Sequence, residues 1–278
     1  MREKRAQVVA ALVEGNSVRA TCRMTGVAKG TVLKLLVDLG AACSAYQDAA
    51  FRNLKLRRVQ CDEIWSYVGM KAKTAARKGR KDAGDIWTWT ALDADTKLVP
   101  SWLVGPRDSG TAFAFIQDLA DRLANRIQLT TDGHRVYLES VESAFGANID
   151  YAMLVKLYGV DERQGEARYS PAVCIGTREI CCTGNPDPRH VSTSYVERQN
   201  LTMRMSMRRF TRLTNAFSRK AENLAAAVAL HFMWYNFGRV HQSLRITPAM
   251  AAGVADHVWT LDEVIGLLEA EEKKAASN

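Results

Sequence analysis

The sequence predicts an α/β protein: a mixed β-sheet flanked by helices, with a small all-α domain at the N-terminus. Two patterns predict this class. After about residue 59, three segments with strand character are followed by alternating helical and strand segments, and before residue 40 three short helical segments are separated by glycine-containing turns. With 278 residues, of which 47% are hydrophobic, the chain can form a large domain with its own core, and its composition is neither disordered nor fibrous.

The N-terminal helices are expected over residues 4–14, 17–25 and 28–39. Ser17 is suited to cap the second helix, while Gly26 and Gly40 are expected to end the second and the third. The polar and basic residues at the start of the third helix are Lys29, Thr31 and Lys34. Two helices joined by a short turn, with such a start to the second, are typical of a DNA-binding helix-turn-helix. A plain three-helix bundle with a solvated basic face explains the same pattern.

The larger domain follows a polar connector. In the larger domain, strands are expected over residues 59–68, 86–92, 97–104, 126–131 and 151–157. Helices are expected in the same part of the chain and in its tail, over residues 109–125, 136–145, 194–209, 221–237 and 261–274. Residues 93–96 favour a turn that joins the second and third strands as a hairpin. Residues 159–193 show no clear periodicity and are expected to be an irregular insertion. The predicted division is a helical domain at 1–45, a linker at 46–58, an α/β domain at 59–250 and a helical tail at 251–278.

The composition narrows the class of protein further. A formal net charge of +8 favours polyanionic partners such as nucleic acid. The six cysteines form no C-x-x-C pair, so a zinc ribbon or a redox motif is unsupported, and reduced thiols in a cytoplasmic protein are expected. No stretch is long and apolar enough to predict a membrane span, so no membrane partner is expected.

Three carboxylates lie in positions that suit a metal site. Asp62 falls inside the first strand, Asp132 ends a later strand, and Glu197 lies in the first turn of a helix. Each has an ordinary explanation: a residue on an exposed strand face, a turn residue, and a first-turn Glu favoured by the helix dipole. Because side chains alternate across a strand, only one of Asp62 and Glu63 is expected to face a shared cluster. Together, acids on a strand, a strand end and a helix favour divalent metal ions and phosphoryl transfer.

At these residues the sequence resembles a known family, the insertion-sequence-one family of bacterial DDE transposases. The segments that carry the resemblance are Cys61–Lys71, Thr131–Tyr137 and Val196–Arg204, with Phe217–Lys220 and the N-terminal Arg19–Val27 in support. The resemblance implies a ribonuclease H-like catalytic domain in which Asp62, Asp132 and Glu197 bind Mg²⁺ or Mn²⁺. It also implies cleavage at the ends of a mobile element and strand transfer into target DNA. The protein would then be a homo-oligomer that binds double-stranded DNA both at the element ends and at the target.

Basic residues near these motifs are candidates for contact with DNA phosphates. Those in the loop after the first strand are Lys71, Lys73, Arg77, Lys78, Arg80 and Lys81, and those expected along the Glu197 helix are Arg204, Arg208 and Arg209. A solvated hairpin tip also explains the loop. Two other functions remain open from the sequence. One is a non-catalytic helix-turn-helix DNA-binding protein derived from a transposase, and the other is a ribonuclease H-like nuclease without strand transfer.

Overall fold

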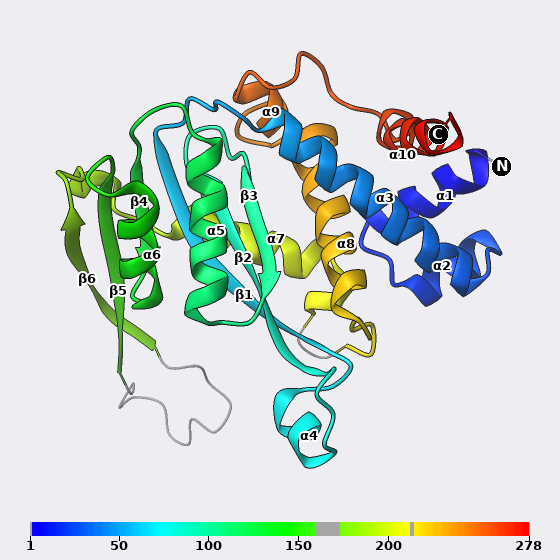
Figure 1. Ribbon diagram of the computed structural model, residues 1–278, viewed down its shortest axis with the longest axis horizontal. Coiled ribbons are helices and arrows are strands. Elements are labelled where there is room, and N and C mark those ends of the chain that lie inside the picture. The colour runs from blue at the N-terminus through cyan, green and yellow to red at the C-terminus, as the bar shows by residue number, and fades with distance from the viewer. Residues whose placement is uncertain (1, 160–172, 212–213, 278) are drawn as a thin grey trace.

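A six-stranded mixed sheet forms the centre of the molecule (Figure 1). The computed structural model describes residues 2–159, 173–211 and 214–277. The strands are β1 (Arg58–Val68), β2 (Gly84–Asp93), β3 (Ser101–Gly105), β4 (Gln128–Asp132), β5 (Asp150–Gly159) and β6 (Val173–Thr183), in the spatial order β3-β2-β1-β4-β5-β6. β1, β4 and β5 run parallel to one another, whereas the other neighbours pair antiparallel. The predicted mixed sheet is therefore confirmed, and it is compatible with a ribonuclease H-like fold.

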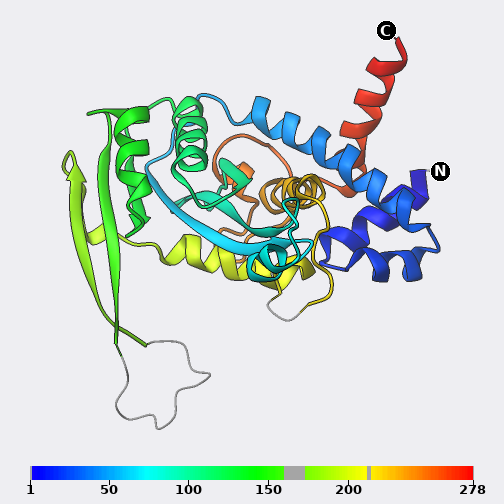
Figure 2. The same ribbon diagram turned by 60° about the horizontal axis from the view of Figure 1, so that its bottom comes forward.

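Helices cover both faces and one end of this sheet. They are α1 (Arg2–Val13), α2 (Val18–Thr25), α3 (Lys29–Ala50), α4 (Ala72–Arg77), α5 (Ser109–Arg122), α6 (Val136–Phe145), α7 (Ser194–Ser206), α8 (Ala221–Met233), α9 (Pro248–Ala251) and α10 (Leu261–Ser277). Two short 3₁₀ helices, η1 (Pro188–His190) and η2 (Arg208–Phe210), and a π-helix, η3 (Trp234–Gly238), complete the set in the described part of the chain. Figure 2 shows α7 on the face opposite α5, and α7 packs against β1 and β2. α8 packs against β3 and against α3, which links the sheet to the N-terminal helices.

The helices bury the faces that their apolar residues predict. The inward side of α5 is made by Phe115, Ile116 and Leu119, all inaccessible to solvent. On α7, Val196 and Met203 are fully buried against the sheet, while Leu201 and Arg204 on the other side are exposed. Burying each such side chain adds roughly 1.5–3 kcal/mol to the free energy of unfolding. This burial holds α7 against the middle of the sheet.

The third helix runs well past Gly40, so the prediction that it ends there is wrong. α3 continues without interruption to Ala50 and therefore includes residues 46–50, the first part of the segment expected to be a linker. Gly40 is buried against α8, where an added Cβ would lie 2.6 Å from the Cα of Ala226. The missing side chain thus allows two helix backbones to approach closely, and it has no role in ending the helix.

Replacing Gly40 by alanine is expected to destabilise the protein, although alanine favours helices. The new methyl group would overlap the backbone of Ala226, and such overpacking costs about 1–3 kcal/mol in the free energy of unfolding. Gly30 lies on the same helix, where an added Cβ would have no other atom within 4 Å, so Gly30→Ala is the matched control and should be neutral or stabilising by about 0.5–1 kcal/mol. Urea denaturation of both variants tests this, and equal stabilities would contradict the close packing.

Two strands differ from their predicted extents. β3 begins only at Ser101, because Lys97 adopts a left-handed φ of 61° and Pro100 has no N–H to donate to a neighbouring strand. The region 159–193 is not wholly irregular, since β6 pairs antiparallel with β5 along the sheet edge. Most side chains of β6 are exposed, so it lacks the alternation of buried residues that would have indicated a strand. Residues 160–172 of the predicted insertion lie outside the described residues.

The two ends of the chain pack together beside the N-terminal helices (Figure 1). α10 packs against α3 and α1, and Arg5 forms a bidentate ion pair with Glu272 at 2.7–2.8 Å. None of the helices in the described part of the chain combines the length and apolar character needed to cross a bilayer. The six cysteines are all free in the structure.

Candidate metal centre

Two of the three predicted acids meet where β1 and β4 run side by side. The parallel register ends with Cys61 opposite Thr131, so Asp62 and Asp132 follow immediately on neighbouring strands. Carboxylate oxygens of Asp62, Glu63 and Asp132 all lie within 4.8 Å of one another. Three carboxylates at this spacing offer the hard oxygen ligands that Mg²⁺ and Mn²⁺ prefer.

Glu63 belongs to this cluster, so the expectation that only one of Asp62 and Glu63 can face it is wrong. β4 stops at Asp132 while β1 continues, and side chains from both faces of β1 can therefore approach Asp132 around the end of the shorter strand. Asp62 lies on the α7 side, where Nδ2 of Asn200 donates to its Oδ2 at 2.8 Å. Glu63 lies toward the opposite side, where Arg107 donates to its Oε2 at 3.1 Å.

Asp132 is held by its own turn. One oxygen accepts from the backbone N–H of His134 at 3.0 Å, as expected for an Asp-Gly turn, and the other lies 3.7 Å from Arg107. The side chain remains 35% exposed, whereas that of Glu63 is only 1% exposed. Asp132 is thus open to a ligand from solvent, and Glu63 is enclosed behind it.

Glu197 lies outside the tight group of three carboxylates. It is in the first turn of α7, one turn before Asn200, and it accepts hydrogen bonds from Thr193 and from Lys156 of β5. Its negative charge contributes to raising the pKa of Asp62. Glu197 therefore faces the same region of the sheet, with its charge balanced by Lys156.

A buried glutamine fixes the start of α7. Oε1 of Gln60 accepts from the backbone N–H groups of Tyr195 and Val196 at 2.9 and 3.1 Å. These are among the N–H groups that have no partner within a helix, and Gln60 is itself only 3% exposed. Gln60 on β1 therefore positions the helix turn that carries Glu197 relative to the strand that carries Asp62.

Gln60→Ala is expected to lower the free energy of unfolding by about 1–3 kcal/mol, because the buried N–H of Val196 and the partly buried N–H of Tyr195 lose their acceptor. Chemical denaturation measures this loss. Gln117→Ala on the exposed side of α5 is the matched control and should have little effect. If the two variants were equally stable, Gln60 would not hold α7 in place.

The crowding of acids changes their protonation. Burial, followed by the charges of Glu63 and Asp132, raises the pKa of Asp62 to about 7. Burial also raises the pKa of Glu63, although the neighbouring Tyr137 hydroxyl and Arg107 oppose the rise. One oxygen of Glu63 is buried without a hydrogen-bond partner among the described residues. A site in which carboxylates resist ionisation in this way gains from a bound cation.

The basic residues predicted to contact DNA are distributed over three surfaces. All six in the β1–β2 connection are exposed, on and around α4, although Arg80 forms a bidentate pair with Asp82. Lys29, Thr31 and Lys34 are exposed at the start of α3, where Lys34 pairs with Asp38 at 2.5 Å.

The third surface does not form as predicted. α7 ends at Ser206, so Arg204 is exposed on the helix and Arg208 is exposed just beyond it. Arg209 instead turns inward and bonds to the hydroxyl of Ser218. The expectation that Arg209 continues the Glu197 helix is wrong, because the chain changes direction at Met207 to bury Met207 and Phe210.

No known protein-family model matches this chain, and no curated protein matches it significantly. Its function therefore has to be inferred from the residues of the site. Several of these had no distinctive sequence signal: Gln60, Arg107, Lys156 and Asn200 are polar residues of common types that meet only through the fold.

Proposed function

We propose that this chain is a metal-dependent DNA transposase, which cleaves the ends of a mobile element and joins them to target DNA. The observation that carries the proposal is the convergence of Asp62 and Asp132 from adjacent parallel strands, with Glu197 facing them from α7. The exposed basic residues of the β1–β2 connection are available to DNA phosphates, and the motifs around the acids resemble those of DDE transposases.

The donors suit Mg²⁺ or Mn²⁺, because the group found among the described residues consists of carboxylate oxygens, without a thiol or an imidazole. Asp62, Asp132 and Glu197 are the residues proposed to hold the metal. When bound, divalent ions neutralise charge on a phosphodiester and favour in-line displacement at phosphorus. Asn200 orients Asp62 through its side-chain amide, and Lys156 balances the charge of Glu197.

Glu197 is proposed as the third acid in preference to Glu63, although Glu63 lies nearer. The Glu197 side chain is 39% exposed and within reach of a DNA strand, whereas that of Glu63 is 1% exposed and bonded to Arg107. In this assignment Glu63 does not bind the metal, and its negative charge acts on the site from its enclosed position next to Asp132. We expect Glu197→Gln to reduce DNA cleavage by about 10²-fold, and Glu63→Gln by about tenfold or less.

Steady-state cleavage rates of these two isosteric variants decide between the acids, since each removes one charge with little change in volume. A larger loss in Glu63→Gln than in Glu197→Gln would assign the third position to Glu63.

The proposed activity is tested with purified protein and a plasmid that carries the gene with its flanking genomic DNA. We expect nicking that requires Mg²⁺ or Mn²⁺, is abolished by EDTA, and is followed by covalent joining to a second plasmid. Nicking without joined products would instead support a nuclease. DNA binding without cleavage, unchanged by EDTA, would support a non-catalytic DNA-binding protein.

A further inference from the structure

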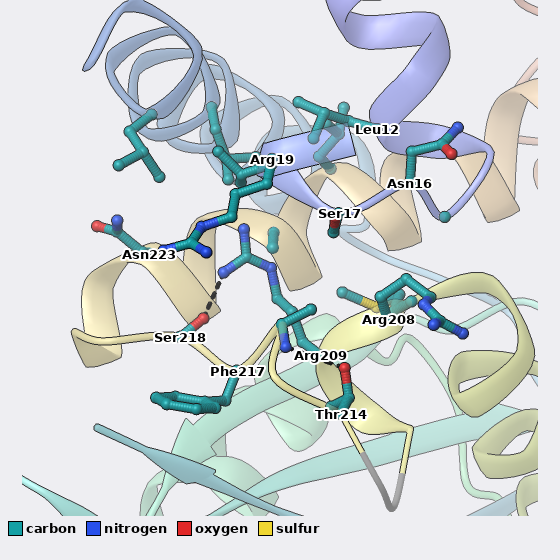
Figure 3. Close-up of a pocket in the computed structure, with 18 of the residues that line it drawn as sticks. Leu12, Asn16, Ser17, Arg19, Arg208, Arg209, Thr214, Phe217, Ser218 and Asn223 are labelled. Atoms are coloured by element: carbon teal, nitrogen blue, oxygen red, sulfur yellow. Dashed lines mark hydrogen bonds between the residues drawn. The ribbon is translucent and has the colours of Figure 1, made fainter. Parts of the chain in front are cut away.

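A second site of a different character lies between the N-terminal helices and the sheet domain. It is a cavity of about 730 Å³ whose walls come from α2, the start of α3, the segment after α7 and the side of α8. Figure 3 shows Arg19, from α2, and Arg209 reaching into this space from opposite walls, with Ser218 and Asn223 beside them. The cavity is separate from the carboxylate cluster, because the two share no residue.

The lining of this cavity is strongly cationic. Its basic residues are Arg19, Arg23, Lys29, Arg208, Arg209 and Arg219. No acidic residue lies among the described residues that line it, and none of the six basic groups has a carboxylate within 4 Å in the described part of the chain. Gathering like charges without a counter-charge costs free energy that a bound anion would recover.

Two buried groups in the wall also lack adequate partners. Burial lowers the pKa of Arg209 to about 10, and its hydrogen-bond partner is the neutral hydroxyl of Ser218. His231 is 9% exposed, lines the same cavity, and its Nε2 has no hydrogen-bond partner among the described residues. Buried polar groups are normally satisfied, so a guanidinium whose only partner is a neutral hydroxyl and an imidazole nitrogen without a partner, both beside a hollow space, favour a missing polar ligand.

We propose that this cavity binds the phosphate groups of a nucleotide, either free or at the end of a DNA strand. Arginine donors bind phosphate oxygens in bidentate geometry, and several arginines around one space suit a ligand with more than one negative charge. The volume lies within the range of about 300–1,000 Å³ typical of small-ligand pockets, which a nucleotide fits and a DNA duplex exceeds.

The proposal is tested by calorimetric titration with pyrophosphate, a nucleoside triphosphate, and a single-stranded 10-mer with or without a 5′-phosphate, all in EDTA. We expect Arg19→Gln and Arg209→Gln each to weaken binding at least tenfold, because each removes a charged hydrogen-bond donor. Arg57→Gln removes one exposed positive charge outside the cavity and is the matched control, expected to stay within about twofold of the original affinity.

Arg19 is exposed and its substitution should not affect folding, which thermal melting of each variant verifies. Tighter binding of the triphosphate than of the oligonucleotides would identify a free nucleotide as the ligand. Preference for the 5′-phosphorylated strand over its hydroxyl form would identify a strand end. No binding to the original protein, or equal loss in Arg57→Gln and Arg19→Gln, would overturn the proposal.

Phosphate binding in the cavity can be tested independently of the proposed transposase activity. Asp132→Asn should bind all four probes with unchanged affinity, because no carboxylate of the metal centre borders the cavity. Failure of catalysis with retained phosphate binding would therefore refute only the proposed function.

Discussion

Asp132→Asn is expected to reduce DNA cleavage and joining on the order of 10³-fold, while DNA binding changes little. Asparagine has the same shape and its Oδ1 can still accept from the N–H of His134. The fold should therefore persist, and the loss would come from removing the negative charge that is most accessible in the cluster. Steady-state cleavage rates at saturating Mg²⁺ measure the effect.

Asp121→Asn is the matched control for this variant. Asp121 is exposed on α5, where it accepts only from Gln117 among the described residues, so its substitution should leave the cleavage rate unchanged. Cleavage by Asp132→Asn at a rate near that of the original protein would refute the assignment of Asp132 to the metal centre.

Asp62→Asn is expected to stabilise the metal-free protein at pH 8, although we also expect it to abolish the proposed cleavage activity. The folded-state pKa of Asp62 is raised from 3.8 to about 7, so the metal-free protein loses stability as pH rises between those values. That difference corresponds to roughly 4 kcal/mol for an isolated group, and because Glu63 and Asp132 share the repulsion we expect a gain of about 2–3 kcal/mol. Once the Asn200 amide flips, the new Nδ2 can donate to Oδ1 of Asn200, which has no partner among the described residues.

Urea denaturation in EDTA at pH 8 and at pH 4 tests both the size and the sign of this effect. The gain should be nearly absent at pH 4, where Asp62 is protonated in the folded protein. Adding Mg²⁺ at pH 8 should reverse the order of stability, because it stabilises only the form that binds it. An Asp62→Asn variant less stable than the original protein in EDTA at pH 8 would show that the acids do not repel one another as inferred.

The pattern of apolar residues along the sequence predicted secondary structure correctly where buried positions recur at a regular spacing. The periodic apolar residues of α5 predicted that helix, and the turn at residues 93–96 predicted the β2–β3 hairpin. The same reasoning identified Asp62 as a strand residue and Asp132 as the end of another strand. These features depend on neighbours within a few positions along the chain, which are visible in the sequence itself.

The sequence by itself therefore determined the α/β class, the order of most elements and the strand positions of Asp62 and Asp132. Only the tertiary structure decided that Gly40 allows α3 to pack against α8, since a glycine that ends a helix and one that admits a neighbouring backbone look the same locally. It also brought Glu63 to Asp132, because this contact depends on where β4 stops. The physical reason is that side chains distant in sequence meet through strand register and packing, which no local period encodes.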